Sequence, residues 1–239
     1  MIPKPQITCF LLLATLLVTS GCTTTSKKTE KLTRGEVFTQ IYIEKPGSIV
    51  VLPPVNSSAL AEATEYYINT IEKPLTLAGY DVLSEETVTK TIQEKNLQDT
   101  EALYALPPET LHDYFGTDMV LYSRIKQWNM AKTGLISRLI ISVESEIIST
   151  KTSQQLWRYN SSLNIDLDTI KSIGGSVHVL LKEMLTDADE ATVIAMSYAL
   201  RLNNKLIRDL PYGPTHEQYL QDQETKMIGI VPEKSILRP

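Results

Sequence analysis

The chain has 239 residues, of which 28 are acidic and 23 are Lys or Arg, so its net charge at pH 7 is −5. This mildly acidic balance argues against a nucleic-acid-binding protein, because such proteins neutralise phosphates with a basic surface. The two cysteines are Cys9 and Cys22. If Cys9 is removed with a cleaved leader, no disulfide can form within the chain, and stability must come from a packed core.

The first residues have the layout of a secretory signal peptide. Lys4 precedes an apolar stretch at 7–18, and the small residues Ser20 and Gly21 stand directly before Cys22. The apolar stretch is too short to span a bilayer, which takes about 20 such residues. We therefore expect cleavage and export of the chain.

The cysteine at the end of this segment resembles the lipobox of bacterial lipoproteins, in which the thiol is acylated, for example with palmitate. The resemblance implies a signal peptide at 1–21 and lipidation of Cys22; an ordinary signal peptide with a chance cysteine is the alternative. Thr23 stands where an aspartate would favour retention in the inner membrane, which implies the outer membrane instead. Residues 22–45 are largely polar and predict a lipidated tether.

An α/β unit is predicted after the tether. A short β-branched run at 48–52 predicts a buried strand, and apolar residues recur at helical spacing over 60–78. A second strand at 80–83 is followed by a helix that Ser84 caps, and a further short helix is expected at 107–116. The order is βαβαα.

The pattern then changes to strict alternation of apolar and polar residues, which predicts an antiparallel three-strand meander. Its expected strands are 118–129, 135–149 and 157–165. A final helix is predicted to begin between Asp187 and Glu190. The predicted fold is thus an α/β domain at 46–210 with a mixed sheet and C-terminal helices, followed by an irregular tail at 211–239.

No combination of residues predicts a metal site or an enzyme. His112, His178 and His216 lie in different predicted elements, and none has a second His or Cys at ligand spacing. Ser123 and Lys126 match the Ser-x-x-Lys spacing of serine acyl-enzymes, but on a strand these positions point to opposite faces. We therefore expect a protein without catalysis, metal or cofactor.

Glu144 and Glu146 lie on one face of a predicted strand and could form a carboxylate pair. Cross-strand pairing with the basic residues Arg124, Lys126 and Arg138 on a solvated face accounts for them more simply.

Tyr122, Trp128 and Arg158 are candidates for an interaction surface. If the helices leave one sheet face uncovered, these residue types could anchor a protein interface there. Core filling is the alternative, and the strand register decides between the two.

Five stretches of the chain resemble the bacterial lipoprotein family called domain of unknown function 799, which includes a meningococcal lipoprotein antigen. They are SIVVLPPVN (48–56), PLTLAGYDVL (74–83), LHDYFGTDMVLYSRIKQW (111–128), QLWRYNSS (155–162) and LPYGPTH (210–216). The resemblance implies a fold similar to the N-terminal domain of periplasmic translocation proteins and to curli-type secretion lipoproteins. It also implies envelope assembly and lipoprotein partners. The segment HVLLKEMLTDADE is more charged than its counterpart in the family.

These observations predict an outer-membrane-anchored, periplasm-facing lipoprotein that acts as a non-catalytic binding or assembly component of an envelope complex. Its expected partners are the membrane, through the lipid on Cys22, and envelope proteins, including other lipoproteins or further copies of itself. One alternative is a regulator or weak hydrolase of peptidoglycan or glycan that uses Glu144 and Glu146. Another is a carrier of a small molecule or lipid.

Overall fold

A mixed six-stranded sheet organises the residues that the computed structural model describes, which are 32–133, 136–166 and 190–227. Its strands are β1 (Ser48–Val51), β2 (Val55–Asn56), β3 (Asp81–Val82), β4 (Met119–Thr133), β5 (Ile136–Ser149) and β6 (Gln155–Asp166). The order is β3-β1-β4-β5-β6, and β2 pairs with β4. β1 runs parallel to β3 and β4, whereas β4, β5 and β6 are antiparallel. The predicted mixed sheet, with an antiparallel three-strand meander after the βαβαα unit, is confirmed.

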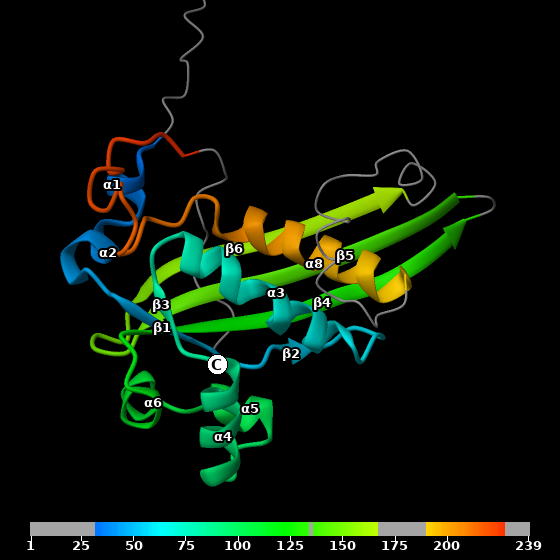
Figure 1. Ribbon diagram of the computed structural model, residues 1–239, viewed down its shortest axis with the longest axis horizontal. Helices are drawn as coiled ribbons and strands as arrows, with labels where there is room; N and C mark the ends of the chain where they lie inside the picture. The colour runs from blue at the N-terminus through cyan, green and yellow to red at the C-terminus, as the bar shows by residue number, and fades with distance from the viewer. Residues whose placement is uncertain (1–31, 134–135, 167–189, 228–239) are drawn as a thin grey trace, which may run out of the picture. The chain divides into compact units, whose positions relative to one another are not determined.

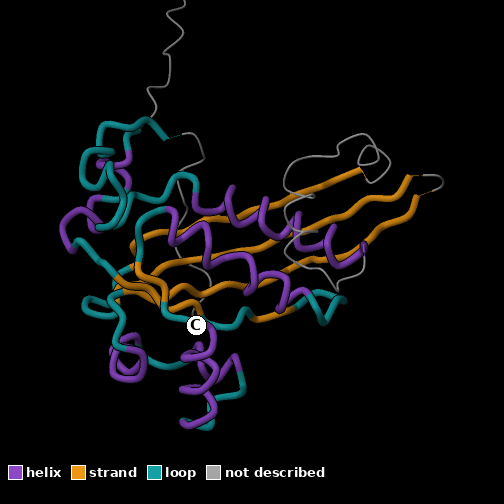
Figure 2. The backbone as a smooth tube through the Cα atoms, viewed as in Figure 1, coloured by secondary structure: helices purple, strands orange, loops and turns teal. Residues whose placement is uncertain are grey.

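Helices lie on both faces of this sheet (Figure 1). They are α1 (Arg34–Val37), α2 (Thr39–Glu44), α3 (Ala63–Leu77), α4 (Glu85–Glu94), α5 (Thr100–Tyr104), α6 (Pro108–Phe115) and α8 (Glu190–Ile207). α3 and α8 lie side by side on one face and run along the long strands, whereas α4, α5 and α6 pack on the other side, near β1 (Figures 1 and 2).

Alternating residues of the strands divide the interior into two cores. Ile49 of β1 and Leu121 of β4 point to the core under α3 and α8. Their neighbours Val50 and Tyr122 point to the core under α4, α5 and α6. Because strand side chains alternate between faces, one short strand such as β1 serves both cores, and this explains its continuous apolar sequence.

The domain begins earlier than its predicted boundary at residue 46. α1 and α2 occupy much of the predicted tether, and α1 starts with a capping box. In it the Thr33 N–H donates to Glu36 Oε2 at 2.8 Å, and the Glu36 N–H donates to Thr33 Oγ1 at 3.3 Å. α1 gains stability from contacts with the C-terminal segment, and α2 from hydrogen bonds that Ser149 and Thr152 donate to Glu44. No local sequence pattern indicates these contacts. Residues 22–31 lie outside the described part.

The C-terminal segment that was predicted to be an irregular tail is ordered in its described part, which ends at Met227, and packs against α1. Arg34 Nη1 lies 2.8 Å from Asp222 Oδ2, and Arg34 Nη2 donates to the Arg208 carbonyl at 2.9 Å. The Tyr212 N–H also donates to Asp222 Oδ2, at 3.1 Å. Both charged side chains are buried. An ion pair therefore joins residues that are 188 positions apart in the chain.

Two glycines bring the tail against the end of α3. Gly79 has φ +94°, the left-handed conformation expected for it. The Gly213 N–H donates to the Ala78 carbonyl at 2.7 Å, and the Thr215 N–H donates to the Gly79 carbonyl at 3.1 Å. A Cβ on Gly213 would lie 2.4 Å from the Gly79 oxygen, so neither backbone leaves room for a side chain.

Asp118 connects the start of β1 to the start of β4. Its Oδ2 accepts hydrogen bonds from the N–H groups of Gly47 at 2.8 Å and Ser48 at 3.3 Å, and Lys151 Nζ lies 2.7 Å from Oδ1. Burial alone would raise the pKa of Asp118. The hydrogen bonds from Lys151, Gly47 and Ser48 outweigh burial and hold that pKa below its ordinary value.

An Asp118→Asn variant is expected to lose about 1–2 kcal/mol of unfolding free energy at pH 7, because charge-assisted hydrogen bonds are lost. Since folding lowers the pKa of Asp118, its stabilisation is present above the unfolded-state pKa of about 4 and disappears as the pH falls through the folded-state value. Urea unfolding at pH 7 and pH 3 should show the difference from the wild type narrowing at acidic pH. The control is Asp113→Asn, because Asp113 is exposed on α6. A difference in unfolding free energy between wild type and Asp118→Asn that is equal at pH 7 and pH 3 would contradict the prediction.

Candidate functional site

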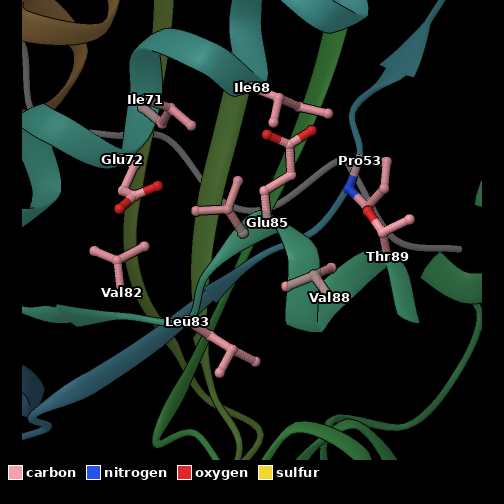
Figure 3. A pocket seen from close by; sticks show the side chains of 10 residues that line it. Pro53, Ile68, Ile71, Glu72, Val82, Leu83, Glu85, Val88 and Thr89 are labelled. Carbon is pink, nitrogen blue, oxygen red and sulfur yellow. The ribbon is translucent and has the colours of Figure 1, made fainter. Parts of the chain in front are cut away.

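A groove opens between α3 and α4, at the carboxyl ends of the parallel strands β1 and β3 (Figure 3). Its cavity volume is about 40 Å³, and the groove is open to solvent. Open α/β sheets bind ligands outside the carboxyl ends of their strands, at the point where the strand order reverses. In the order β3-β1-β4 this point lies between β1 and β4, so the groove shares the strand-end location but lies on the β3 side of β1. We call it the α3–α4 groove, and its lining residues are Val51, Pro53, Ile68, Ile71, Glu72, Val82, Leu83, Glu85, Val88 and Thr89.

The local sequence explains why the groove stays open. Pro53 follows β1 and lacks the N–H that would extend the strand ladder. After β3, Ser84 caps α4, and its Oγ accepts a hydrogen bond from the Thr87 N–H at 3.4 Å. The chain therefore turns into α4 directly after β3, and Val82 and Leu83 remain only half-buried.

The floor of the groove is apolar. Ile71 of α3 and Val88 of α4 are 1% and 4% exposed and belong to the two cores. Val51, Ile68, Val82 and Leu83 are half-buried. Aliphatic surface is thus accessible at the bottom of the groove, where a ligand could cover it.

Two carboxylates stand at the rim, on opposite walls. Glu72 comes from α3 and Glu85 from the first turn of α4, and both residues are exposed (Figure 3). The helix dipole favours negative charge at the position of Glu85. Within the described ranges, neither carboxylate takes part in an ion pair. The lining residues therefore combine aliphatic surface with negative charge.

The α3–α4 groove was not among the sites predicted from the sequence. Its residues come from four segments, each of which was interpreted only as a strand or a helix. A usable signal was nevertheless present, because the βαβ order places the ends of β1 and β3 side by side. The two glutamates could not be assigned to one groove without the packing of α3 and α4.

The residues predicted as an interface are inside the protein. Tyr122, Trp128 and Arg158 are 0%, 1% and 2% exposed. Tyr122 packs edge-on against Tyr104 with ring centroids 5.0 Å apart, whereas Trp128 contacts Tyr66 in the other core, at 5.9 Å. The interface prediction is therefore wrong, and the core alternative holds, because the register points the two aromatic rings to opposite covered faces.

The predicted carboxylate pair is not presented to solvent. Lys126 Nζ lies 3.4 Å from Glu144 Oε2, which confirms a charge pair on this face. Glu146 is fully buried, between Tyr122 and Arg158 in the register of the three long strands. The expectation of a solvated face is wrong at Glu146, because alternation predicts which residues share a face but not whether that face is covered.

The serine and lysine at Ser-x-x-Lys spacing do not meet. Ser123 Oγ lies 2.6 Å from Tyr67 Oη and 2.8 Å from Ser145 Oγ, in the core under α3. Lys126 instead pairs with Glu144. The predicted separation of this pair is confirmed, and Ser123 serves as a buried structural hydroxyl.

The two histidines in the described part of the chain contact other protein groups. His112 Nδ1 lies 2.9 Å from the Thr117 carbonyl oxygen, and His216 stacks on Tyr212 with centroids 3.6 Å apart. His178 and the predicted lipidation site Cys22 lie outside the described residues. Across the described ranges we find no cluster of His, Cys, Asp or Glu suited to a metal ion, and no helix long and apolar enough to cross a membrane.

Comparison with known proteins gives a family match and a similar solved structure. Residues 37–214 match the family GNA1162-like, described as "Putative lipoprotein GNA1162-like". The Neisseria meningitidis serogroup B protein "Putative lipoprotein NMB1124/NMB1162" is 29% identical over 126 residues, which cover 53% of this chain and 59% of the relative. The match thus spans about three fifths of that curated relative.

The crystal structure of lipoprotein GNA1162 from Neisseria meningitidis has a TM-score of 0.50 and 26% identity, and the match covers 59% of this chain and 94% of the other. A PelC dodecamer from Paraburkholderia phytofirmans has a TM-score of 0.42 and 14% identity, with coverage of 71% and 91%. The family match includes the βαβαα unit, the meander and the glycine contact at the tail. The resemblance to a bacterial lipoprotein family with a meningococcal member is confirmed, and the chain belongs to the GNA1162-like lipoprotein family.

Proposed function

We propose that this lipoprotein is anchored in the outer membrane through Cys22, faces the periplasm and acts, without catalysis, as a binding or assembly component of an envelope complex. Family membership and the lipobox-like sequence support the anchor. The observation that carries the binding role is the α3–α4 groove, with its accessible apolar floor and two rim carboxylates.

Binding is better supported than hydrolysis by the surroundings of the carboxylates. A glycan hydrolase needs two carboxyl groups at a cleft, one of them in surroundings that keep it protonated. Glu146 is buried and Glu144 is paired with Lys126, so these two cannot flank a substrate. Glu72 and Glu85 lie at an open rim on exposed helix surfaces, and neither is enclosed by apolar side chains as the acid of such a pair is.

A photo-cross-linking experiment tests the proposal. With p-benzoylphenylalanine in place of Thr89 in the full chain, irradiation of intact cells is expected to give a discrete adduct with one envelope protein, because Thr89 lines the groove. Mass spectrometry identifies the adduct, and deletion of the identified partner should remove it. The matched control carries the cross-linker at Lys90, the next residue on α4, which is exposed and lies outside the lining.

The same cells test the anchor. The Cys22→Ser variant is expected to leave the outer-membrane fraction and to lose the adduct, since the acyl acceptor is absent. Equal adducts from positions 89 and 90, no adduct from either, or a Cys22→Ser chain that stays in the outer-membrane fraction would contradict the proposal.

A further inference from the structure

We propose that the α3–α4 groove receives a Lys or Arg side chain from an extended segment of the partner protein. The aliphatic stem would lie on the floor of the groove and the cationic head between Glu72 and Glu85. This inference rests on the proposed function, because it names the chemistry that the binding site recognises.

The floor matches the stem of such a side chain. Half-buried Val51, Ile68 and Val82 present aliphatic surface in the open groove, above the buried Ile71 and Val88. Long basic side chains cover apolar surface with their methylene groups while the charged end stays near water. A groove with an apolar floor and a rim open to solvent can hold the methylene groups on its floor and leave the charged end near water.

The rim of the groove carries charge opposite to that of a Lys or Arg side chain. Two carboxylates on opposite walls attract a cation and repel phosphate or carboxylate ligands. A neutral apolar ligand would reduce the hydration of Glu72 and Glu85 without compensating their charge. Because neither glutamate has an ionic partner among the described residues, both charges are available to a ligand.

The sheet edge provides the approach for a polypeptide. β3 is the outermost strand beside the groove, and among the described strands it pairs only with β1. An extended segment can therefore run along this edge and insert one side chain into the groove, as in other cases of strand recognition with side-chain pockets. This geometry favours a protein side chain over a free amine.

Methyl NMR of the detergent-solubilised full chain tests the inference with two probes. They are the acetylated, amidated tripeptide Ala-Lys-Ala and its counterpart with norleucine, which keeps the stem but lacks the charge. The lysine peptide is expected to shift the methyl signals of Ile68, Ile71 and Val88 and to bind about 2- to 30-fold more tightly than the norleucine peptide, as two exposed charge pairs would give.

The double variant Glu72→Gln/Glu85→Gln should bind the lysine peptide more weakly by the same factor. Its affinity for the norleucine peptide should equal that of the wild type. Its matched control is Glu65→Gln/Glu86→Gln, which also removes one exposed charge from α3 and one from the first turn of α4 but leaves the groove lining intact. This control should bind both peptides as the wild type does.

Failure of this inference is distinguishable from failure of the proposed function. Equal affinity for the two peptides, or no methyl shifts with either, would overturn the cation site even if the Thr89 adduct forms. Selective binding of the lysine peptide without any cellular adduct would support the groove chemistry and count against the assembly role.

Discussion

Replacing Asp222 with alanine is expected to lower the free energy of unfolding by about 3–5 kcal/mol, because it leaves the buried guanidinium of Arg34 without its counter-charge. Arg34 and Asp222 have side-chain exposures of 7% and 1%, and the Tyr212 N–H would lose its acceptor as well. The loss is large compared with the total stability of a typical domain, about 5–15 kcal/mol. Urea unfolding of the full chain, followed by circular dichroism, measures it.

Two comparisons make the Asp222 prediction specific. Lys90→Gln breaks an exposed i,i+4 pair with Glu94 and is expected to change stability by less than about 0.5 kcal/mol. The double variant Arg34→Met/Asp222→Leu removes both charges and should recover most of the stability, since an apolar pair can replace a buried ion pair. If Asp222→Ala behaves like Lys90→Gln, the junction between α1 and the C-terminal segment does not stabilise the domain.

Replacing Gly213 with alanine is expected to cost about 3 kcal/mol, at the upper end of the usual range for overpacking. The new Cβ would lie 2.4 Å from the oxygen and 2.6 Å from the carbon of the Gly79 carbonyl, and backbone atoms cannot rotate away as a flexible side chain can. Separating the two segments would also break the hydrogen bond from the Gly213 N–H to the Ala78 carbonyl. Equilibrium unfolding checks the value.

Gly116→Ala provides the matched control. Gly116 has φ +69° at the end of α6, and a Cβ there would meet no atom within 4 Å. Alanine should therefore cost only about 1 kcal/mol for the left-handed backbone. A loss at Gly213 as small as the loss at Gly116 would contradict the prediction, because it would show that the close approach of the two chain segments costs little.

The sheet could be predicted because its signals are local. Alternation over 135–149 has the period of a strand, and the apolar run at 48–52 is too short for a helix. Ser84 and Gly79 mark a helix start and a helix end by side-chain chemistry and backbone freedom. Each of these signals depends on a few neighbouring residues, and the structure confirms them.

The first two helices could not be predicted because their stability is not local. α1 and α2 are four and six residues long, well below the length at which a helix is stable alone. α1 depends on contacts with Arg208 and Asp222. α2 depends on hydrogen bonds that Ser149 and Thr152 donate to Glu44, and all these partners are distant in the sequence. The burial of Glu146 and Arg158 was missed for a similar reason, since a polar residue on an alternating strand indicates a solvated face unless its covering elements are known.

The ion pair between Arg34 and Asp222 also determines how the two ends of the described chain depend on each other. Thr33 and Lys226 form an antiparallel bridge, and the Met227 N–H donates to the Leu32 carbonyl at 2.9 Å. The first and last described residues therefore lie side by side. A chain shortened before Asp222 would lose the partner of α1 together with its own last turn, so the start of the domain requires that its end be present.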